Sequence, residues 1–256
     1  MTATRISSSS ASAGALCVAA LILVLSGHAH AEKWGGEHIK GSGVATTETR
    51  AATGFRNVAL GVGANVEIRQ GASEGLTITG DDNIVPLIET VVDSGTLKIR
   101  WASKGHYSTS YKGVAIVVNV RNIDSLSVSS SGDIHAAQLK TTDLRATIAG
   151  SGDISVGALD ARSLSVQIAG DGDVTVAGRV EALDATISGS GDLDAAKLES
   201  RAVRITMHGS GDAAVWAKDT LNATIAGSGE ITYSGKPQVT KTVAGSGSVN
   251  RAGDAS

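Results

Sequence analysis

A short phrase, Ser-Gly-Asp or a close variant, returns at a nearly fixed interval through the second half of the chain. The clear copies are Ser131-Gly132-Asp133, Ser151-Gly152-Asp153, Asp171-Gly172-Asp173, Ser190-Gly191-Asp192 and Ser210-Gly211-Asp212, and the weaker ones are Ser228-Gly229-Glu230 and Ser246-Gly247-Ser248. The aspartates are 20, 20, 19 and 20 residues apart. Such a period is typical of a solenoid, in which each repeat forms one coil that stacks on the next.

The segments between these phrases alternate apolar and polar residues, which is the pattern of a β-strand with one buried face. Aligned on the repeat, the apolar residues form two columns: Leu144, Leu164, Leu183, Val203 and Leu221, and Ile148, Ile168, Ile187, Met207 and Ile225. Coils stacked about 4.8 Å apart would bury both columns. The sequence therefore predicts an all-β fold, a single-stranded parallel β-helix with coils of about 20 residues.

The first 31 residues have the features of a targeting signal. Arg5 precedes an apolar run from Ala15 to Leu25, and Ala29-His30-Ala31 follows. This pattern predicts a signal peptide over residues 1–31, cleaved between Ala31 and Glu32. The apolar run is short for a stable anchor, so no membrane anchor is expected after cleavage, and an uncleaved anchor is the alternative. The protein is expected in the periplasm, on the outer cell surface or outside the cell.

Composition indicates whether the mature chain can form disulfide bonds and which class of partner its charge disfavours. Cys17, the single cysteine, lies in the predicted signal peptide, so the mature chain would hold no disulfide bond. Without Arg5 the chain has 21 (22 − 1) basic and 25 acidic residues, a net charge of −4, which argues against nucleic acid as a partner.

The positions of the repeated phrases and of the alternating segments also divide the mature chain into regions. We expect a loose polar leader over residues 32–49, a β-helix domain over 50–249 and a frayed tail over 250–256. Within the domain, residues 50–128 should form irregular coils or an N-terminal cap, and 129–249 the regular Gly-Asp coils. In the irregular part, 84–92 should be a strand with a bend and 103–112 a loop.

The aspartates of the repeat should line one corner of the solenoid: Asp133, Asp153, Asp173, Asp192 and Asp212. Two like charges about 4.8 Å apart in water repel by roughly 0.9 kcal/mol, so something must offset this repulsion. One interpretation is local: each Asp accepts backbone N–H bonds in its own turn, and the glycine takes a positive φ. These glycines are Gly132, Gly152, Gly172, Gly191, Gly211, Gly229 and Gly247. The alternative is a row of cations such as Ca²⁺ on the carboxylates, which would make a Ca-stabilised scaffold. No cofactor is predicted.

Several segments, taken in order, are similar to those of a known family. They are Gly54-Phe55, 66–71, 80–83, 95–99 and the copies of 150–153. Together, from about Arg50 to Val249, they resemble the head GIN domain family. The resemblance implies a right-handed parallel β-helix. Members of this family are labelled autotransporter adhesins, without an established activity or catalytic residues. The weak phrases at Glu230 and Ser248 depart from the pattern in the final coils.

The main functional hypothesis is an adhesin-like or structural module that binds glycans or cell-surface proteins. Polar residues predicted to face outward would suit weak, repeated contacts: Thr147, Ser165, Gln167, Thr186, Thr206 and Thr224. A glycan-binding patch could be formed by Trp34, Trp101, Trp216, Tyr107 and Tyr111. Trp101, however, follows Leu97 and Ile99 at the alternate positions expected to face inward, so it is expected to fill the core or cap a coil. The alternative is a polysaccharide lyase or hydrolase, but no catalytic residue is singled out, and fold alone does not decide function.

Overall fold

The computed structural model describes residues 38–103, 105–109 and 113–253, and the predicted cleavage site between Ala31 and Glu32 lies outside them. The described elements are strands, apart from the short 3-10 helix η1 (Val85–Leu87). In the N-terminal part the strands are β1 (His38–Lys40), β2 (Ala45–Arg50), β3 (Asn57–Leu60), β4 (Ala64–Gln70), β5 (Gly75–Asp81), β6 (Ile88–Asp93), β7 (Thr96–Trp101), β8 (His106–Ser108) and β9 (Val114–Val120). They are followed by β10 (Ser125–Val128), β11 (Asp133–Ala136), β12 (Leu139–Lys140), β13 (Asp143–Ile148), β14 (Ile154–Asp160), β15 (Ser163–Gly170), β16 (Val174–Gly189), β17 (Leu193–Gly209), β18 (Ala213–Gly227), β19 (Glu230–Ser234), β20 (Gln238–Gly245) and β21 (Ser248–Gly253).

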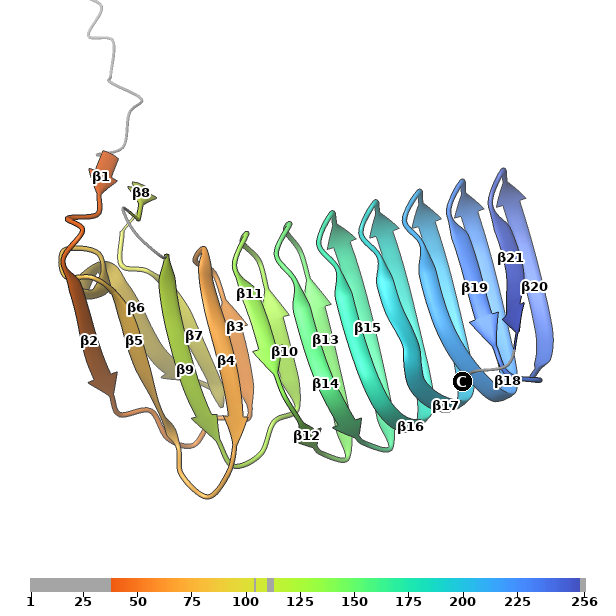
Figure 1. The fold of residues 1–256 in the computed structure, drawn as a ribbon, viewed down its shortest axis with the longest axis horizontal. Coiled ribbons are helices and arrows are strands. Elements are labelled where there is room, and N and C mark those ends of the chain that lie inside the picture. Colours follow the sequence, from red (N-terminus) through yellow and green to blue (C-terminus); the bar gives the residue numbers. More distant parts are fainter. Residues whose placement is uncertain (1–37, 104, 110–112, 254–256) are drawn as a thin grey trace, which may run out of the picture. The chain divides into compact units, whose positions relative to one another are not determined.

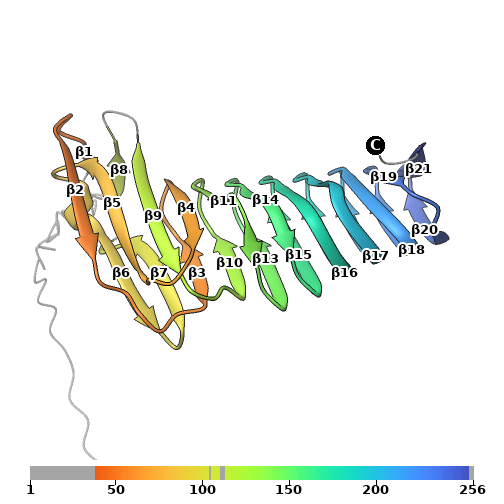
Figure 2. The ribbon, with the colours of Figure 1, turned by 60° about the horizontal axis from the view of Figure 1, so that its bottom comes forward.

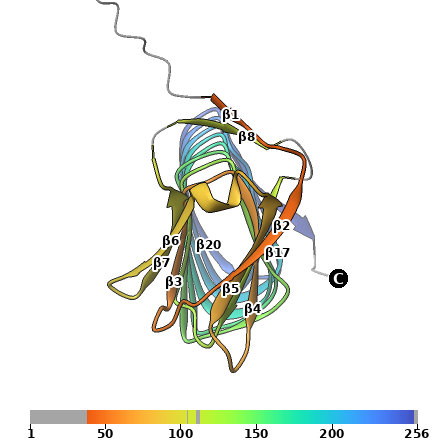
Figure 3. The same cartoon turned by 90° about the vertical axis from the view of Figure 1, so that its left-hand side faces the viewer.

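The regular coils stack in parallel, and each coil contributes to two walls (Figure 1). In the first wall β10, β13 and β15 pair in turn and are followed by the C-terminal halves of β16, β17 and β18. In the second wall β11 and β14 are followed by the N-terminal halves of the same long strands. The two walls face each other in the view along the stack (Figure 3). The predicted β-solenoid with coils of about 20 residues is confirmed.

The side chains predicted to stack lie next to one another in register. Ile148 pairs with Ile168, which pairs with Ile187 in the following coil. Leu164 likewise pairs with Leu144 on one side and Leu183 on the other. All members of both predicted columns are buried. Because similar aliphatic side chains meet at each step of about 4.8 Å, the stack has a continuous core that no single coil could bury.

Two rows of glycine mark the corner where the first wall turns into the second, which we call the Gly-Asp corner. The first row consists of the central glycine of each Ser-Gly-Asp phrase, and these residues lack the positive φ that was predicted for them. That prediction was wrong for Gly132, Gly152, Gly172, Gly191, Gly211, Gly229 and Gly247. These residues are glycine because the coils approach closely: a Cβ on Gly172 would lie 2.2 Å from the carbonyl oxygen of Gly152. Positive φ belongs to the row two residues earlier, at Gly170, Gly189, Gly209, Gly227 and Gly245.

The order of coils in space differs from their order in the sequence. The coil of β3 and β4 pairs on one side with β10 and β11. On its other side it pairs with β7 and β9, which come later in the chain than β3 and β4 (Figure 2). After β1 and β2, the chain therefore forms the inner coil of β3 and β4, continues through the outer strands of this end, and then returns to begin the regular coils.

Antiparallel strands close this end of the stack. β5 pairs with β9, β2 pairs with β5, and β6 pairs with β7. η1 lies across the opening between the walls (Figure 3). Arg50 at the end of β2 donates hydrogen bonds to the backbone oxygen of Val85 at 3.0 Å and to that of Ile88. This side chain attaches β2 to the segment that covers the opening.

Three polar segments expected to be loose contain strands. The leader holds β1 and β2, and the expected loop over residues 103–112 holds β8, which pairs with β1. The expected tail continues β21 to Gly253, paired with β19. The segment 84–92, expected as a strand with a bend, contains η1 and then β6. A strand at the edge of a sheet is solvated, so polar residues such as those of β2 can form it without apolar alternation.

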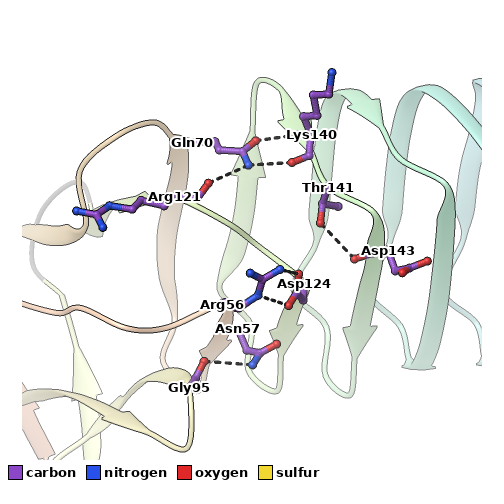
Figure 4. Close-up of polar contacts among 9 residues, drawn as sticks. All are labelled: Arg56, Asn57, Gln70, Gly95, Arg121, Asp124, Lys140, Thr141 and Asp143. Atoms are coloured by element: carbon purple, nitrogen blue, oxygen red, sulfur yellow. Dashed lines mark hydrogen bonds and ion pairs between the residues drawn. The ribbon is translucent and has the colours of Figure 1, made fainter.

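Side-chain hydrogen bonds join the inner irregular coil to the first regular coil (Figure 4). The Gln70 amide accepts the backbone N–H of Lys140 at 2.8 Å and donates to the backbone oxygens of Lys140 and Arg121. Arg56 binds both carboxylate oxygens of Asp124, at 2.5 and 2.7 Å. The Gln70 amide thus continues the pairing between coils beyond the end of β4.

Candidate binding surfaces

The carboxylates of the repeat lie along the Gly-Asp corner and form hydrogen bonds between coils. Oδ1 of Asp133 accepts the backbone N–H of Asp153 at 3.0 Å, and Oδ1 of Asp153 accepts that of Asp173 at 2.9 Å. The same bond recurs along the corner to Asp192, Asp212 and Glu230. The prediction that each Asp serves its own turn was wrong, because the acceptor serves the following coil.

These bonds offset the repulsion between the carboxylates. A hydrogen bond to a charged group contributes about 1.5–3 kcal/mol, whereas the repulsion between neighbours is roughly 0.9 kcal/mol. Among the described residues, no group of three or more His, Cys, Asp or Glu side chains could hold a metal ion. Ca²⁺ binding at Asp133, Asp153, Asp173, Asp192 and Asp212 stays a prediction, which a calcium titration followed by thermal melting tests.

The outer side of the first wall, which we call the polar face, carries polar side chains in register. Thr206 pairs with Thr186 on one side and Thr224 on the other. The neighbouring row mixes charges, since Asp184 pairs with Ser165 and Arg204. The residues predicted to face outward are indeed exposed or half-buried: Thr147, Ser165, Gln167, Thr186, Thr206 and Thr224. The polar face therefore presents similar groups at the spacing of the coils.

A groove of about 540 Å³ runs along the opposite corner, where the second wall turns back into the first. We call it the corner groove, and its lining residues are Gln70, Gln138, Leu139, Lys140, Ala158, Leu159, Asp160, Gly178, Arg179, Glu199 and Trp216. Leu139 and Leu159 give it an apolar floor. The leucine row is interrupted at Gly178, which pairs with Leu159 and carries no side chain. A Cβ there would lie 2.1 Å from the Leu159 carbonyl oxygen, so the interruption is fixed by the backbone.

Charges of alternating sign flank the corner groove. Asp160 forms ion pairs with Lys140 at 3.6 Å and with Arg179 at 3.2 Å. Glu199, in register with Arg179, pairs with Lys218 at 2.8 Å. The hydrogen bond from Arg179 lowers the pKa of Asp160, and the same contact raises the pKa of Arg179. Both groups therefore keep their charges, and the charges of neighbouring coils balance.

This electrostatic arrangement bears on the hypothesis of a glycan-cleaving enzyme. The general acid of a glycosidase is a carboxyl group whose pKa is raised, so that it holds a proton near neutral pH. The pKa of Asp160 is lowered instead. Asp160 thus suits a fixed anion that accepts hydrogen bonds better than it suits a proton donor.

The predicted aromatic patch is divided between separate places. Trp101 is half-buried against the core and stacks on Tyr107, with ring centroids 4.1 Å apart and planes 20° apart. This agrees with its predicted core-filling role. Trp216 lines the corner groove, in a coil far along the stack from Trp101. Trp34 and Tyr111 lie outside the described residues.

Sequence reasoning missed the corner groove. Its polar residues Gln138, Asp160, Arg179 and Glu199 were not singled out. A signal was nevertheless present, because charges of alternating sign recur with the period of the repeat at Lys140, Asp160, Arg179, Glu199 and Lys218. Opposite charges at equivalent positions of successive coils indicate a ladder of contacts along one corner.

The part of the chain that the structure describes contains no helix long and apolar enough to cross a membrane. Residues 54–237 match the sequence model of the family described as "Putative auto-transporter adhesin, head GIN domain". No curated protein matches the chain.

Solved structures from several bacteria share this fold. A "putative adhesin" from Bacteroides fragilis has 26% sequence identity and a TM-score of 0.76, covering 83% of this chain and 99% of its own. A "putative lipid binding protein" from Parabacteroides distasonis has 25% identity and a TM-score of 0.69, covering 84% of this chain and 99% of its own. A "putative adhesin" from Parabacteroides merdae has 23% identity and a TM-score of 0.66, covering 84% of this chain and 98% of its own.

Proposed function

Because this chain belongs to the family described as "Putative auto-transporter adhesin, head GIN domain", we propose that it is an exported, adhesin-like module that binds glycans or proteins of a cell surface. Binding rather than catalysis is the function proposed. The adhesin descriptions of the family and of the similar structure from Bacteroides fragilis support a surface role.

The observation that carries this proposal is the register of the outward polar side chains. Thr186, Thr206 and Thr224 occupy equivalent positions of successive coils, and their backbones are fixed by pairing on both sides. A group held in this way loses little conformational entropy when it binds, so weak contacts repeated along a rigid surface can add to useful affinity.

Export is part of the proposal and has its own test. Mass spectrometry of the protein recovered from an expressing bacterium should give a mature chain that begins at Glu32. An intact N-terminus in the membrane fraction would contradict cleavage and favour the uncleaved anchor.

Attachment is tested with the purified mature chain. Fluorescently labelled protein is incubated with bacterial and epithelial cells and counted by flow cytometry, next to a labelled β-solenoid of unrelated sequence. We expect saturable binding that unlabelled protein displaces. Binding equal to that of the control solenoid on every cell type would refute the proposal.

A further inference from the structure

We propose that the corner groove is a binding site for a neutral oligosaccharide chain that lies along the stack of coils. This inference rests on the proposed binding function, names a ligand class for it, and adds the corner groove as a binding site separate from the polar face. Four properties of the groove support it: its length, its aromatic end, its hydrogen-bonding groups and the balance of its charges.

The length of the groove suits an extended ligand. Its lining comes from successive coils, beginning with Gln70 of β4, passing through Leu139 and Leu159, and ending with Trp216 of β18. Five steps of about 4.8 Å give a length of roughly 24 Å. A chain of several sugar rings can follow such a groove, whereas a compact metabolite would contact only one part of it.

The aromatic end of the groove suits a sugar ring. Trp216 is half-buried, so part of its ring remains accessible beside the groove. An indole ring combines a large, rigid apolar face with one N–H donor. The C–H face of a pyranose ring can pack on this apolar face, while the hydroxyl groups at its edge remain free for polar partners.

The polar groups of the groove can donate hydrogen bonds to a sugar hydroxyl group and can also accept hydrogen bonds from it. Gln138 is exposed, and its side-chain amide makes no hydrogen bond with any residue that the structure describes, so this amide can both donate and accept. Arg179 offers N–H donors, and Asp160 and Glu199 offer carboxylate acceptors that are already held in place by ion pairs. A hydroxyl group donates and accepts at once, so paired donors and acceptors at the spacing of the coils match a polyol.

The charge balance selects a neutral ligand. The charged residues that line the groove are two cations, Lys140 and Arg179, and two anions, Asp160 and Glu199, so the lining presents no excess of one sign. A polyanion such as an acidic polysaccharide would need to displace the carboxylates from their partners. We therefore expect neutral chains to bind and strongly acidic ones to bind poorly.

The test uses the full mature chain and defined neutral probes: cellohexaose, xylohexaose, maltohexaose and mannohexaose, with a hexameric oligogalacturonate as the acidic comparison. Binding is followed by isothermal titration calorimetry and by tryptophan fluorescence. We expect at least one neutral hexamer to bind and to change the fluorescence. Binding of the oligogalacturonate alone, or of none of the probes, would overturn the inference.

Substitutions in the groove test whether the ligand binds there. Trp216→Ala should weaken binding at least tenfold and abolish the fluorescence change, whereas Trp101→Phe, away from the groove, should retain both. Ala158→Trp offers a second variant, because Ala158 is exposed and its enlargement would obstruct the groove without disturbing the core. Unchanged affinity in both Trp216→Ala and Ala158→Trp would refute this site. If these variants still attach to cells, the adhesin-like function survives and only the groove is excluded.

Discussion

At the scale of single residues, the two glycine rows of the Gly-Asp corner are required for different reasons. Gly170 and its equivalents have a positive φ, which costs a residue with a side chain more than it costs glycine. Gly172 and its equivalents leave no space for a Cβ beside the preceding coil. A sequence shows only that glycine recurs. The reason for each row depends on how closely neighbouring coils approach, which is a property of the stack.

The close approach predicts that Gly172→Ala destabilises the fold by about 1–3 kcal/mol or more, because the added methyl would meet backbone that cannot move without breaking the pairing of two coils. The atoms in question are the Gly152 carbonyl oxygen at 2.2 Å and the Ile148 Cγ2 at 3.0 Å. The matched control is Gly71→Ala, where a Cβ meets nothing within 4 Å. Urea unfolding should show a lower midpoint for the first variant only, and equal midpoints would contradict the explanation.

The inter-coil bonds of the aspartates give a second prediction at this scale. Oδ1 of Asp173 accepts the backbone N–H of Asp192 at 2.8 Å. Asp173→Ala removes this acceptor but also relieves the repulsion of Asp173 with the neighbouring carboxylates, so it should lower the free energy of unfolding by about 1 kcal/mol. Asp173→Asn keeps an oxygen at this position and removes a negative charge from the row, so it should cost less than the alanine variant. If both variants cost the same in urea unfolding, the side chain does not act as an acceptor between coils.

At the scale of elements, two sequence signals together predicted the regular coils well: the alternation of apolar and polar residues, and the period of the Ser-Gly-Asp repeat. Strands such as β13 and β15 have one face in the core and one in water, so their sequences alternate, and the period then aligns Leu144 with Leu164. The strands β2 and β8 did not show this signal. β2 pairs only with β5 among the described strands, and its residues are exposed or half-buried along their length.

The corner groove was missed for a related reason. It lies where β16 and β17 bend from the second wall into the first. The pairing of β16 with β17 shifts register between Thr175 and Gly178, and that of β17 with β18 shifts between Ala195 and Glu199. A register shift breaks the alternation of a strand, so the positions of side chains at this corner do not follow from the period of two. The period of the repeat indicates the row of alternating charges, but the other residues of the groove could be listed only after the bulges were known.

The last coil shows how the C-terminal end of the stack is protected. β20 pairs with β18, and no strand within the described residues pairs with its other edge. Lys241 stands in register with the buried Ala223, where preceding coils carry small or aliphatic residues, and Val243 follows with 40% of its surface exposed. An open strand edge invites pairing with another chain, and a charge in the inward column opposes it.

This arrangement predicts that Lys241→Val promotes end-to-end association. The apolar column would then continue to the end of the stack, and burying the new side chain between two copies contributes about 1.5 kcal/mol, or roughly tenfold in affinity. Lys197→Val is the control, because Lys197 is exposed in β17, away from the end of the stack. Sedimentation velocity over a range of concentrations should show larger species for Lys241→Val. Identical behaviour of the two variants would show that Lys241 does not block the end.

At the scale of the whole molecule, ion pairs connect successive coils along the corners opposite to the Gly-Asp corner. Arg56 pairs with Asp124, Arg162 with Asp143, and Arg201 with Asp219. These pairs are exposed, so each contributes little by itself. Two of these contacts affect titration: the hydrogen bond from Arg56 lowers the pKa of Asp124, and those from Ser163 and Arg162 lower the pKa of Asp143.

The lowered carboxyl pKa values predict how the stability of the stack depends on pH. An aspartate in the unfolded chain takes up a proton near pH 4, whereas Asp124 and Asp143 in the fold remain ionised to lower pH. The unfolded state therefore binds more protons in this window, and stability must fall as pH falls through it. Melting temperatures should be nearly constant between about pH 5 and pH 7 and should decrease below about pH 4.

Arg56→Gln separates this effect from general acid denaturation, because it removes the group that lowers the pKa of Asp124 most. The contribution of the pair is present above about pH 4, where the carboxyl of the unfolded chain is ionised, and is lost as pH falls through the pKa of the folded state. The variant should therefore melt below the wild type at pH 7, and the difference should shrink toward pH 2. A difference that stays constant from pH 7 to pH 2 would mean that Arg56 stabilises the junction of the coils by packing rather than through the charge of Asp124.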